Sequence, residues 1–549
     1  MRIVIIGGVA GGMSAATRLR RLDENAEIIV LEKSGYVSYA NCGLPYFVGG
    51  VITKESDLLL QTPESLYQRF RLDVRTFSEV KNINPHTKKI SVKRLQDYSE
   101  YEIAYDRLIL SPGASPIVPA IPGSDRALTL RTVEDVERIS QAVKNKPQSA
   151  VVIGGGFIGV EIAENLRHRH IPTSLVEATD QVLAPLDSEM ASLVADELLK
   201  NDVDLHLGVS AVEIGADSVT LSNGKIIAGE IVIMAIGVRP EISLAESAGL
   251  KIGPRRGIAV DEFNRSSDAY IYAIGDAAEK NDALDGSSTL IPLANIANRH
   301  GRTVADHIAG KNIRSVKSLG TAIVKVFDLT IATTGWNEKR LNAHGSNYAV
   351  IHTHPNSHAG YYPGAKQMSL KLIFNPQTGV ILGAQGIGEE GVDKRIDVIS
   401  TAIRGGITAP QLADLELAYA PPFNSAKDPV NMLGYIAENI MSGLVETVQW
   451  YEIDSFVNRG YQIIDVRNPS ECGRGMIPGA INIPVDDIRE RAHEITSKKV
   501  LVNCQVGQRG HTAALLLKKL GFQAVNLDGG YKTWQSSTAN QKTCSSNTH

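Results

Sequence analysis

The chain has 549 residues, of which 43% are hydrophobic and 21% charged, and its formal net charge is −4. This length leaves room for roughly three to four domains, and the small net charge gives no bulk electrostatic reason to expect nucleic acid or an anionic membrane as a partner. The apolar run at the N-terminus breaks at glycines after six residues. No later stretch approaches the roughly 18 apolar residues of a membrane span.

Cysteine usage indicates a reduced compartment. Four widely separated cysteines provide neither a disulfide framework nor a pair at zinc-like spacing. We therefore predict a cytoplasmic protein.

The N-terminal segment predicts a nucleotide-binding fold. Residues 2–8, 13–22 and 27–33 read as strand, helix and strand around a glycine turn, and the pattern recurs at residues 150–169 and 173–179. Two such βαβ units predict two doubly wound nucleotide-binding domains.

The rest of the chain is read in the same way. Three strands lead into Pro/Gly-rich or Gly-Asp turns, at residues 105–123, 230–250 and 268–279. From about residue 320 strands joined by turns follow, closed by a helical stretch at 431–444. A short α/β unit comes next, with strands at 461–466 and 499–504 and a helix at 511–522.

The second glycine turn fits G-x-G-x-x-G through Gly154, Gly156 and Gly159. Such glycines let a pyrophosphate approach the backbone at the N-terminus of a helix, where unpaired N–H groups favour anions. Glu177 ends the next strand, where a carboxylate would bond a ribose 2′-hydroxyl and repel a 2′-phosphate. We therefore predict an NADH site.

The first glycine turn departs from this pattern. Gly7 and Gly12 occupy the outer positions, but Val9 stands in the middle, and Glu32 ends the second strand. Because Gly275-Asp276 after a strand matches a flavoprotein signature, we predict FAD here, with Asp276 at its ribityl or pyrophosphate region.

At this point a family resemblance emerges. Residues 1 to about 443 resemble the pyridine nucleotide–disulfide oxidoreductase family and, within it, coenzyme A disulfide reductases. The motifs that carry this likeness are residues 7–12, 38–46, 358–365 and 418–428. Residues 448 to 537 resemble a rhodanese domain, through residues 465–467, 475–484 and 504–509. The combination resembles coenzyme A disulfide reductase–rhodanese fusions, including NADH-dependent persulfide reductases.

The resemblance implies an α/β chain with two Rossmann-like domains, an α+β dimerisation domain and a C-terminal α/β rhodanese domain. The implied boundaries are 1–114 with 250–319 for FAD, 115–249 for NADH, 320–443 for dimerisation and 448–537 for rhodanese. The polar composition of the last residues predicts a disordered tail at 538–549. The implied cofactor-binding residues are Gly7, Gly8, Ala10, Gly11, Gly12, Glu32, Lys33, Ser111, Pro112, Gly113, Gly275 and Asp276 for FAD, and Gly154, Gly156, Gly159, Glu177 and Gly237 for NADH.

Cys42 is the predicted redox-active thiol that passes electrons to the substrate. The fifth residue after it is Phe47, so the C-x-x-x-x-C pair of many disulfide reductases is missing. A single thiol must cycle through a mixed disulfide, a persulfide or a sulfenic acid. The resemblance puts Cys42 beside the flavin at a helix start, which would lower its pKa. Related peroxidases and oxidases carry a histidine where this chain has Ala10, so peroxide or oxygen chemistry is not expected as the main task.

The resemblance also implies a coenzyme A site. Arg18 and Arg21 on the first helix suit nucleotide phosphates, and without the family they read as a solvated helix end. Ser38 and Asn41 would line the pantetheine arm. The neighbouring subunit of a homodimer would supply Tyr361, Tyr362, Tyr419 and Lys427, of which Tyr361 and Tyr419 would act in catalysis.

A histidine cluster, His352, His354 and His358, raises the question of a metal. No carboxylate or thiol lies nearby in the sequence, so we predict no metal site.

Cys504 heads the loop CQVGQR between a strand and a helix. Backbone N–H groups around the sulfur, with Arg509, would lower the thiol pKa and stabilise a persulfide. We regard Cys472 and Cys544 as incidental thiols.

The predicted function is NADH-driven, FAD-dependent reduction of a persulfide or polysulfide to hydrosulfide at Cys42. Cys504 handles sulfane sulfur, and coenzyme A is substrate or cofactor. One alternative is plain coenzyme A disulfide reduction, and another is a sulfurtransferase centred on Cys504. A redox-sensing or sulfur-carrier protein would need slow turnover.

Overall fold

The computed structural model describes the backbone of residues 1–546 and the side chains of residues 1–538. The chain forms two compact units. One unit comprises residues 1–178 and 202–320, and the other comprises residues 179–201 and 321–549.

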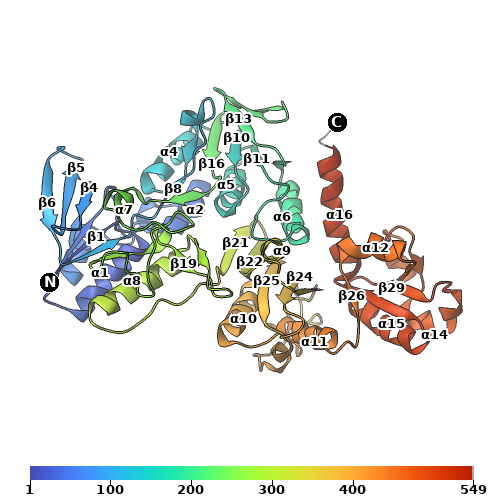
Figure 1. Ribbon diagram of the computed structural model, residues 1–549. Helices are drawn as coiled ribbons and strands as arrows, with labels where there is room; N and C mark the ends of the chain where they lie inside the picture. The colour runs from blue at the N-terminus through green and yellow to red at the C-terminus, as the bar shows by residue number, and fades with distance from the viewer. Residues whose placement is uncertain (547–549) are drawn as a thin grey trace. The chain divides into compact units, whose positions relative to one another are not determined.

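The first unit contains two parallel five-stranded sheets (Figure 1). The strands of one sheet, in spatial order, are β18 (Ile271–Ala273), β7 (Arg107–Leu110), β1 (Arg2–Ile6), β2 (Glu27–Leu31) and β3 (Asp73–Arg75). The strands of the other are β12 (Val203–Leu207), β11 (Thr173–Glu177), β10 (Ala150–Ile153), β16 (Ile231–Met234) and β9 (Leu128–Thr129). Both have fully buried apolar strands, as parallel sheets covered on two faces require.

Helices follow the glycine turns of both sheets. Helix α1 (Ala10–Leu22) follows β1, and α5 (Phe157–His168) follows β10. Helix α8 (Ala294–Ile308) lies beside α1 in Figure 1. The two helices approach closely at Gly301, where an added Cβ would lie 2.3 Å from the carbonyl oxygen of Gly11.

Smaller elements complete the first unit. One antiparallel sheet contains β4 (Ser78–Asn84), β5 (Lys89–Arg94) and β6 (Glu100–Ala104). Another contains β13 (Ala211–Ile214), β14 (Ser218–Leu221) and β15 (Ile226–Ala228). Two further antiparallel pairs are β8 (Ala114–Pro116) with β17 (Val238–Pro240), and β19 (Lys280–Asn281) with β20 (Ser288–Thr289). Its other α-helices are α2 (Leu44–Gly49), α3 (Pro63–Phe70), α4 (Val133–Lys144) and α7 (Ser243–Ser247).

The second unit contains an antiparallel sheet and a parallel sheet. The antiparallel order is β21 (Ala322–Val326), β22 (Leu329–Gly335), β25 (Ile381–Gly388), β24 (Met368–Phe374) and β23 (Ala349–Thr353). Helices α6 (Ser188–Lys200), α9 (Glu338–His344), α10 (Val392–Gly405) and α11 (Pro429–Met441) accompany it.

The parallel sheet lies at the C-terminal end of the chain. Its order is β26 (Thr447–Val448), β30 (Gln523–Leu527), β29 (Lys499–Asn503), β27 (Gln462–Asp465) and β28 (Ile481–Asn482). Its helices are α12 (Ile453–Asn458), α13 (Pro469–Cys472), α14 (Ile488–Arg491), α15 (Gln508–Lys519) and α16 (Gly530–Ser546). The α/β fold class predicted from the sequence is therefore confirmed.

The structure differs from the predicted organisation in two places. Residues 179–201 group with the second unit although they lie inside the predicted NADH domain, because α6 buries its side chains there. Helix α16 reaches Ser546, where a disordered tail was predicted from residue 538. No glycine or proline follows Gly530 to end the helix, and polar composition alone misled the prediction. Residues 547–549 lie outside the described residues.

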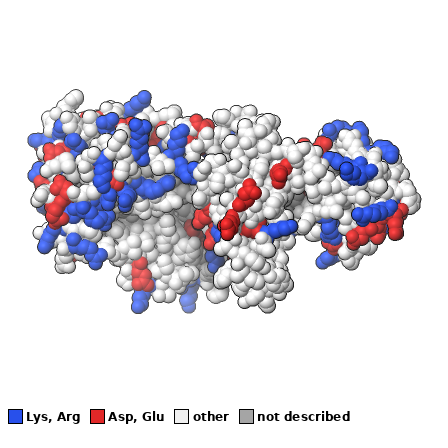
Figure 2. Space-filling model, turned by 90° about the horizontal axis from the view of Figure 1, so that it is seen from below, with Lys and Arg blue, Asp and Glu red and all other residues white. Residues whose placement is uncertain are grey.

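Surface charge is mixed in sign. Basic and acidic side chains are interspersed on the face that Figure 2 shows, in keeping with the formal net charge of −4. In the part of the chain that the structure describes, no helix combines the length and apolar character that a membrane span needs.

Candidate active sites

The first glycine turn is built by close backbone contacts at the end of β1. Gly7 has φ +100°, and a Cβ there would lie 2.1 Å from the carbonyl oxygen of Ser111. A Cβ on Gly12 would lie 1.9 Å from the carbonyl oxygen of Gly7. Both positions require glycine because any side chain would strike backbone.

Three separate segments of the predicted FAD site meet at this turn. A Cβ on Gly11 would lie 3.1 Å from Ser111 Oγ, and one on Gly275, which has φ +70°, would lie 4.0 Å from the same atom. Ser111 follows β7 and Gly275 follows β18, so the carboxyl ends of three parallel strands converge. Pro112 and Gly113 continue from Ser111, Gly113 has φ +75°, and Ala10 begins α1.

Glu32 holds the turn at the end of β2. Its Oε2 accepts a hydrogen bond of 2.8 Å from the Gly8 N–H, and its Oε1 accepts one of 2.9 Å from Ser34. Burial raises the pKa of Glu32 against the opposing effect of these two donors. Lys33 is exposed. The half-buried carboxylate of Glu32, beside this glycine turn, is placed to accept a hydrogen bond from a dinucleotide ribose, so the residues present suit FAD.

The second glycine turn repeats this geometry. A Cβ on Gly154, which has φ +112°, would lie 2.4 Å from the carbonyl oxygen of Ala235, and one on Gly159 would lie 1.8 Å from that of Gly154. A Cβ on Gly156 would meet nothing within 4 Å, so space is open at the start of α5. Glu177 accepts a hydrogen bond of 2.7 Å from Gly155. These features fit NADH.

Gly237 follows β16 with φ +120°. It therefore belongs to the same edge of the sheet as Gly154.

The Cys42 loop is attached to the first glycine turn. Ser38 has φ +48°, and its N–H donates a hydrogen bond of 2.8 Å to the carbonyl oxygen of Gly8. Asn41 and Cys42 are exposed and lie in a short 3-10 turn before α2. The predicted thiol therefore lies close in the chain to an anchor beside the predicted FAD site.

The protein groups around Cys42 oppose the expected lowering of its pKa. Partial burial raises the pKa of this thiol, and the negative charges of Glu161 and Asp276 raise it further.

Glu161 is a functional candidate that the sequence analysis missed. It lies on α5, and its Oε1 accepts a hydrogen bond of 3.2 Å from the Tyr46 hydroxyl. Burial raises the pKa of Glu161 to about 7, so this carboxyl changes charge near neutrality. Its place two residues after Gly159 was the available signal, since a helix that starts at a cofactor directs its first turns toward that site.

The two predicted phosphate-binding arginines have partners already. Arg18 donates to Asp306 Oδ1 through Nε at 3.0 Å and Nη2 at 2.7 Å, and Asp306 is buried. Arg21 is exposed, with its guanidinium 5.9 Å from the centre of the Phe70 ring. Arg18 would have to share its charge between Asp306 and a phosphate.

Tyr361 and Tyr419 come together from two loops of the second unit. Their hydroxyl oxygens are 2.9 Å apart, and both side chains are exposed. Tyr362 packs edge-on against His358, with ring centres 5.6 Å apart. Lys427 is exposed on the second loop.

Arg395, which the sequence analysis also missed, ties these two loops together. It is buried on α10, and its Nη2 donates to the carbonyl oxygen of Ser357 at 3.0 Å and to Asn424 Oδ1 at 2.9 Å. Asp428 Oδ2 lies 3.2 Å from the same nitrogen. A buried guanidinium with one carboxylate and two neutral acceptors is a rigid anchor for the tyrosine pair.

Cys504 lies at the end of β29 in a closed loop. The Gly507 N–H donates to its Sγ at 3.1 Å, and Gly507 has φ +93°. The side chain is fully buried. One backbone N–H, that of Gly507, therefore donates to the sulfur, as a cradle for a sulfur anion requires.

Arg509 is paired rather than free. Its Nη1 and Nη2 donate to the two carboxylate oxygens of Glu471, each at 2.7 Å, which lowers the pKa of Glu471 to about 2. Arg467, paired with Asp465 at 2.7 Å, donates to Gln505 Oε1 at 3.2 Å within the cysteine loop. Two arginine–carboxylate pairs therefore flank Cys504.

Comparisons with known proteins agree with this geometry. Residues 1–301 match the pyridine nucleotide-disulphide oxidoreductase family, residues 321–429 match its dimerisation domain, and residues 451–537 match the rhodanese-like domain. The chain belongs to the pyridine nucleotide-disulphide oxidoreductase family. It is an oxidoreductase whose cofactors are FAD and NAD(H), as the sequence predicted.

Individual relatives extend the match. A coenzyme A disulfide reductase of Staphylococcus aureus is 36% identical over 439 residues, which cover 80% of this chain and 100% of that protein. The structure of reduced Bacillus anthracis CoADR-RHD has a TM-score of 0.97 at 50% identity and covers 98% of both chains. An NAD-dependent persulfide reductase from A. fulgidus has a TM-score of 0.92 at 37% identity, covering 97% of this chain and 100% of that one.

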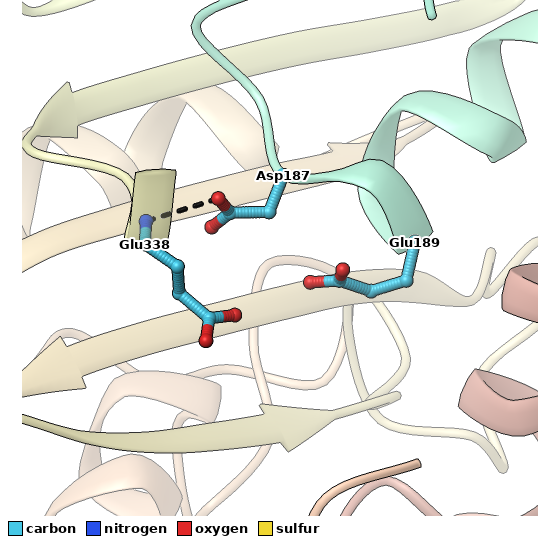
Figure 3. Close-up of side chains that lie close together, drawn as sticks. All are labelled: Asp187, Glu189 and Glu338. Atoms are coloured by element: carbon cyan, nitrogen blue, oxygen red, sulfur yellow. Dashed lines mark hydrogen bonds between the residues drawn. The ribbon is translucent and has the colours of Figure 1, made fainter. Parts of the chain in front are cut away.

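A cluster of carboxylates in this oxidoreductase resembles a metal site. Asp187, Glu189 and Glu338 direct their carboxylates toward one another from α6, the residue before it, and the first residue of α9 (Figure 3). Lys371 Nζ lies 2.8 Å from Asp187 Oδ2 and is hydrogen-bonded to Glu189 and Glu338. The ammonium group of Lys371 therefore supplies the positive charge among these carboxylates.

Lys371 and the three carboxylates shift one another's pKa values. Burial by itself lowers the pKa of Lys371, but the three carboxylates outweigh burial and raise it. Burial raises the pKa of Glu189, but Lys371 and His352 outweigh burial and lower it.

We predict that Glu161→Gln increases the reactivity of Cys42. Removing the negative charge lowers the pKa of the thiol, and below that pKa the thiolate fraction changes tenfold per unit. Iodoacetamide alkylation of Cys42 should be roughly two- to tenfold faster above pH 7, where Glu161 of the wild type is ionised. Equal rates for the two proteins across this range would contradict the electrostatic role of Glu161.

We predict that Lys371→Met destabilises the second unit by about 3–5 kcal/mol, because three buried carboxylates lose their cation. The control is Lys366→Met, which breaks an exposed pair of 2.8 Å with Glu389 and should cost less than about 1 kcal/mol. Thermal unfolding measures both. A melting temperature that falls on adding a chelator to the wild type would show instead that a metal ion stabilises this cluster.

Proposed function

We propose that this oxidoreductase uses NADH to reduce a persulfide, such as coenzyme A persulfide, to hydrosulfide. The overall reaction is RSS⁻ + NADH → RS⁻ + HS⁻ + NAD⁺, which balances in atoms and charge. The observation that carries the proposal is one chain with two sulfur sites, the exposed single thiol Cys42 and the cradled thiol Cys504. The likeness to the NAD-dependent persulfide reductase over nearly the whole chain supports it.

The two glycine turns would hold the cofactors. Gly7, Gly12, Ser111 and Gly275 would receive the FAD pyrophosphate and ribityl chain, with Glu32 at a ribose. Gly156 and Glu177 would receive NADH, and the carboxylate would disfavour a 2′-phosphate. FAD, when bound, carries the electron pair from NADH to sulfur.

Cys42 would act as the nucleophile. Its thiolate attacks one sulfur of the protonated persulfide RSSH, giving either Cys42–S–S–R with release of HS⁻ or Cys42–S–SH with release of the RS⁻ thiolate. Two electrons then break the new S–S bond and restore the thiolate. Glu161, with a pKa raised to about 7 by burial, would gain or lose a proton beside this sulfur at neutral pH.

Coenzyme A recognition would be shared between two subunits. The match of residues 321–429 to a dimerisation domain supports a homodimer. Exposed Tyr361, Tyr362, Tyr419 and Lys427 are free to reach a partner subunit, while Ser38 and Asn41 lie beside Cys42 on their own chain. The Tyr361–Tyr419 pair would donate a proton to the departing thiolate.

Cys504 would hold sulfane sulfur as a persulfide within its N–H cradle. This extends the substrates to polysulfide or larger persulfides. The free thiols Cys42, Cys472 and Cys504 support a reduced cytoplasm as the compartment.

Coenzyme A disulfide reduction is the second candidate. The relative from Staphylococcus aureus bears that name and aligns over its full length, but it leaves the rhodanese-like domain without a task. A sulfurtransferase centred on Cys504 is the third.

The test compares NADH oxidation and sulfide release from coenzyme A persulfide in the wild type, Cys42→Ser, Cys504→Ser and the control Cys472→Ser. Cys42→Ser should lower both rates by more than roughly 1000-fold, because the nucleophile is lost. Cys504→Ser and Cys472→Ser should stay within about threefold of the wild type on this small substrate. Faster turnover of coenzyme A disulfide with negligible sulfide would establish disulfide reduction, and loss of turnover in Cys504→Ser alone would establish the sulfurtransferase.

A further inference from the structure

His352 and His354 both form hydrogen bonds to residues of the rhodanese-like domain. They lie on β23 and in the residue after it, in the antiparallel sheet. His354 Nε2 lies 2.8 Å from Thr533 Oγ1 on α16, and its Nδ1 lies 2.9 Å from Ser369 Oγ. His352 Nδ1 lies 2.7 Å from Asp528 Oδ2, and its Nε2 lies 3.1 Å from Glu189 Oε1.

The two histidines differ in charge. Burial by itself lowers the pKa of His352, but its bonds to Asp528 and Glu189 outweigh burial and the nearby Lys371 and raise it to about 9. Burial holds the pKa of His354 well below its usual value. At neutral pH, His352 is therefore an imidazolium between two carboxylates, and His354 is a neutral ring between two hydroxyls.

Asp528 connects His352 to the end of β30. Its Oδ2 accepts from the His352 N–H at 2.9 Å, from His352 Nδ1 at 2.7 Å and from Gln449 Nε2 at 3.3 Å. Its own N–H donates to Val448 at 2.9 Å. A carboxylate that is 4% exposed keeps this position only while its donors remain.

Gly529 and Gly530 connect Asp528 to the part of the chain that contacts the Cys504 loop. A Cβ on Gly529, which has φ +65°, would lie 2.8 Å from His352 Cβ. A Cβ on Gly530, with φ +63°, would lie 2.4 Å from the Cys504 carbonyl oxygen and 2.8 Å from the Gly507 nitrogen. This two-glycine strip therefore lies between the histidine and the loop.

The backbone after the strip closes the loop. The Tyr531 N–H donates to the Cys504 carbonyl oxygen at 2.7 Å, and the Lys532 N–H donates to that of Gln505 at 3.1 Å. These bonds fix the loop in which the Gly507 N–H contacts Sγ. The position of the sulfur cradle thus depends on where Asp528 is held.

We propose that His352 is a positioning residue for sulfur transfer at Cys504. By holding Asp528 it fixes the two-glycine strip, so the antiparallel sheet completes the cradle of the rhodanese-like domain. The inference rests on the proposed role of Cys504 as a sulfur carrier. This proposal gives His352, one of the histidines considered above as possible metal ligands, a structural role without a metal.

The experiment uses the full-length holoenzyme with thiosulfate and cyanide as probes. Cys504–S⁻ takes sulfur from S₂O₃²⁻, giving Cys504–S–S⁻ and SO₃²⁻, and CN⁻ then removes it as SCN⁻ and restores the thiolate. His352→Ala should lower kcat roughly tenfold, the effect of misplacing a reacting group. His352→Asn should restore most of it, because an asparagine Nδ2 can replace Nδ1 toward Asp528 although the bond to Glu189 is lost.

Hydrogen exchange provides a readout that does not depend on activity. The amides of Tyr531 and Lys532 should lose protection in His352→Ala and regain it in His352→Asn. Thr533→Val, which removes the His354 contact from the same helix, should change neither turnover nor protection. NADH-dependent reduction of coenzyme A persulfide, the proposed reaction at Cys42, should stay within about twofold in all three variants.

Three outcomes would overturn the proposal. They are unchanged turnover and protection in His352→Ala, failure of His352→Asn to rescue, and an equal loss in Thr533→Val. A wild type that transfers no sulfur, while the protection changes occur as expected, would remove the proposed role of Cys504 and leave the positioning of its loop intact.

Discussion

The close approach of backbone to backbone at the carboxyl ends of parallel strands is the constraint on which the sites of this protein depend. It occurs at Gly7 after β1, at Gly154 after β10 and at Gly530 beside the loop after β29. In each case a side chain would strike a carbonyl oxygen, so the chain turns tightly and directs N–H groups toward one point. Two dinucleotide turns and one sulfur cradle result from the same geometry.

The electrostatic surroundings of Cys42 and Cys504 differ. Cys42 is near Glu161 and Asp276, whose charges raise the pKa of its thiol. Cys504 receives a backbone N–H and lies among arginine–carboxylate pairs. The thiol that we propose as the site of reduction and the thiol that we propose as the persulfide carrier therefore lie in different electrostatic surroundings.

The second unit is held together by buried charge as well as by apolar packing. Lys371 binds three carboxylates, and His352 joins one of them, Glu189, to Asp528 of the rhodanese-like domain. Partnered buried charges add little net stability, but losing one partner is costly, so such a network enforces one arrangement of the elements that it joins. Through it, residues 179–201, the antiparallel sheet and the rhodanese-like domain form one compact unit.

The sequence by itself determined the family, the fold class and the order of the domains, and it directed attention to Cys42 and Cys504. These follow from local patterns, since a glycine turn between a strand and a helix requires its residues at fixed spacing whatever else the chain does. Only the tertiary structure decided the electrostatics. The raised pKa of Cys42, the pairing of Arg18 with Asp306 and of Arg509 with Glu471, and the bonds of His352 to Glu189 and Asp528 all depend on residues 38 to 288 positions away in the chain. Charge interactions depend on distance in space and on burial, and neither can be read from spacing along the chain.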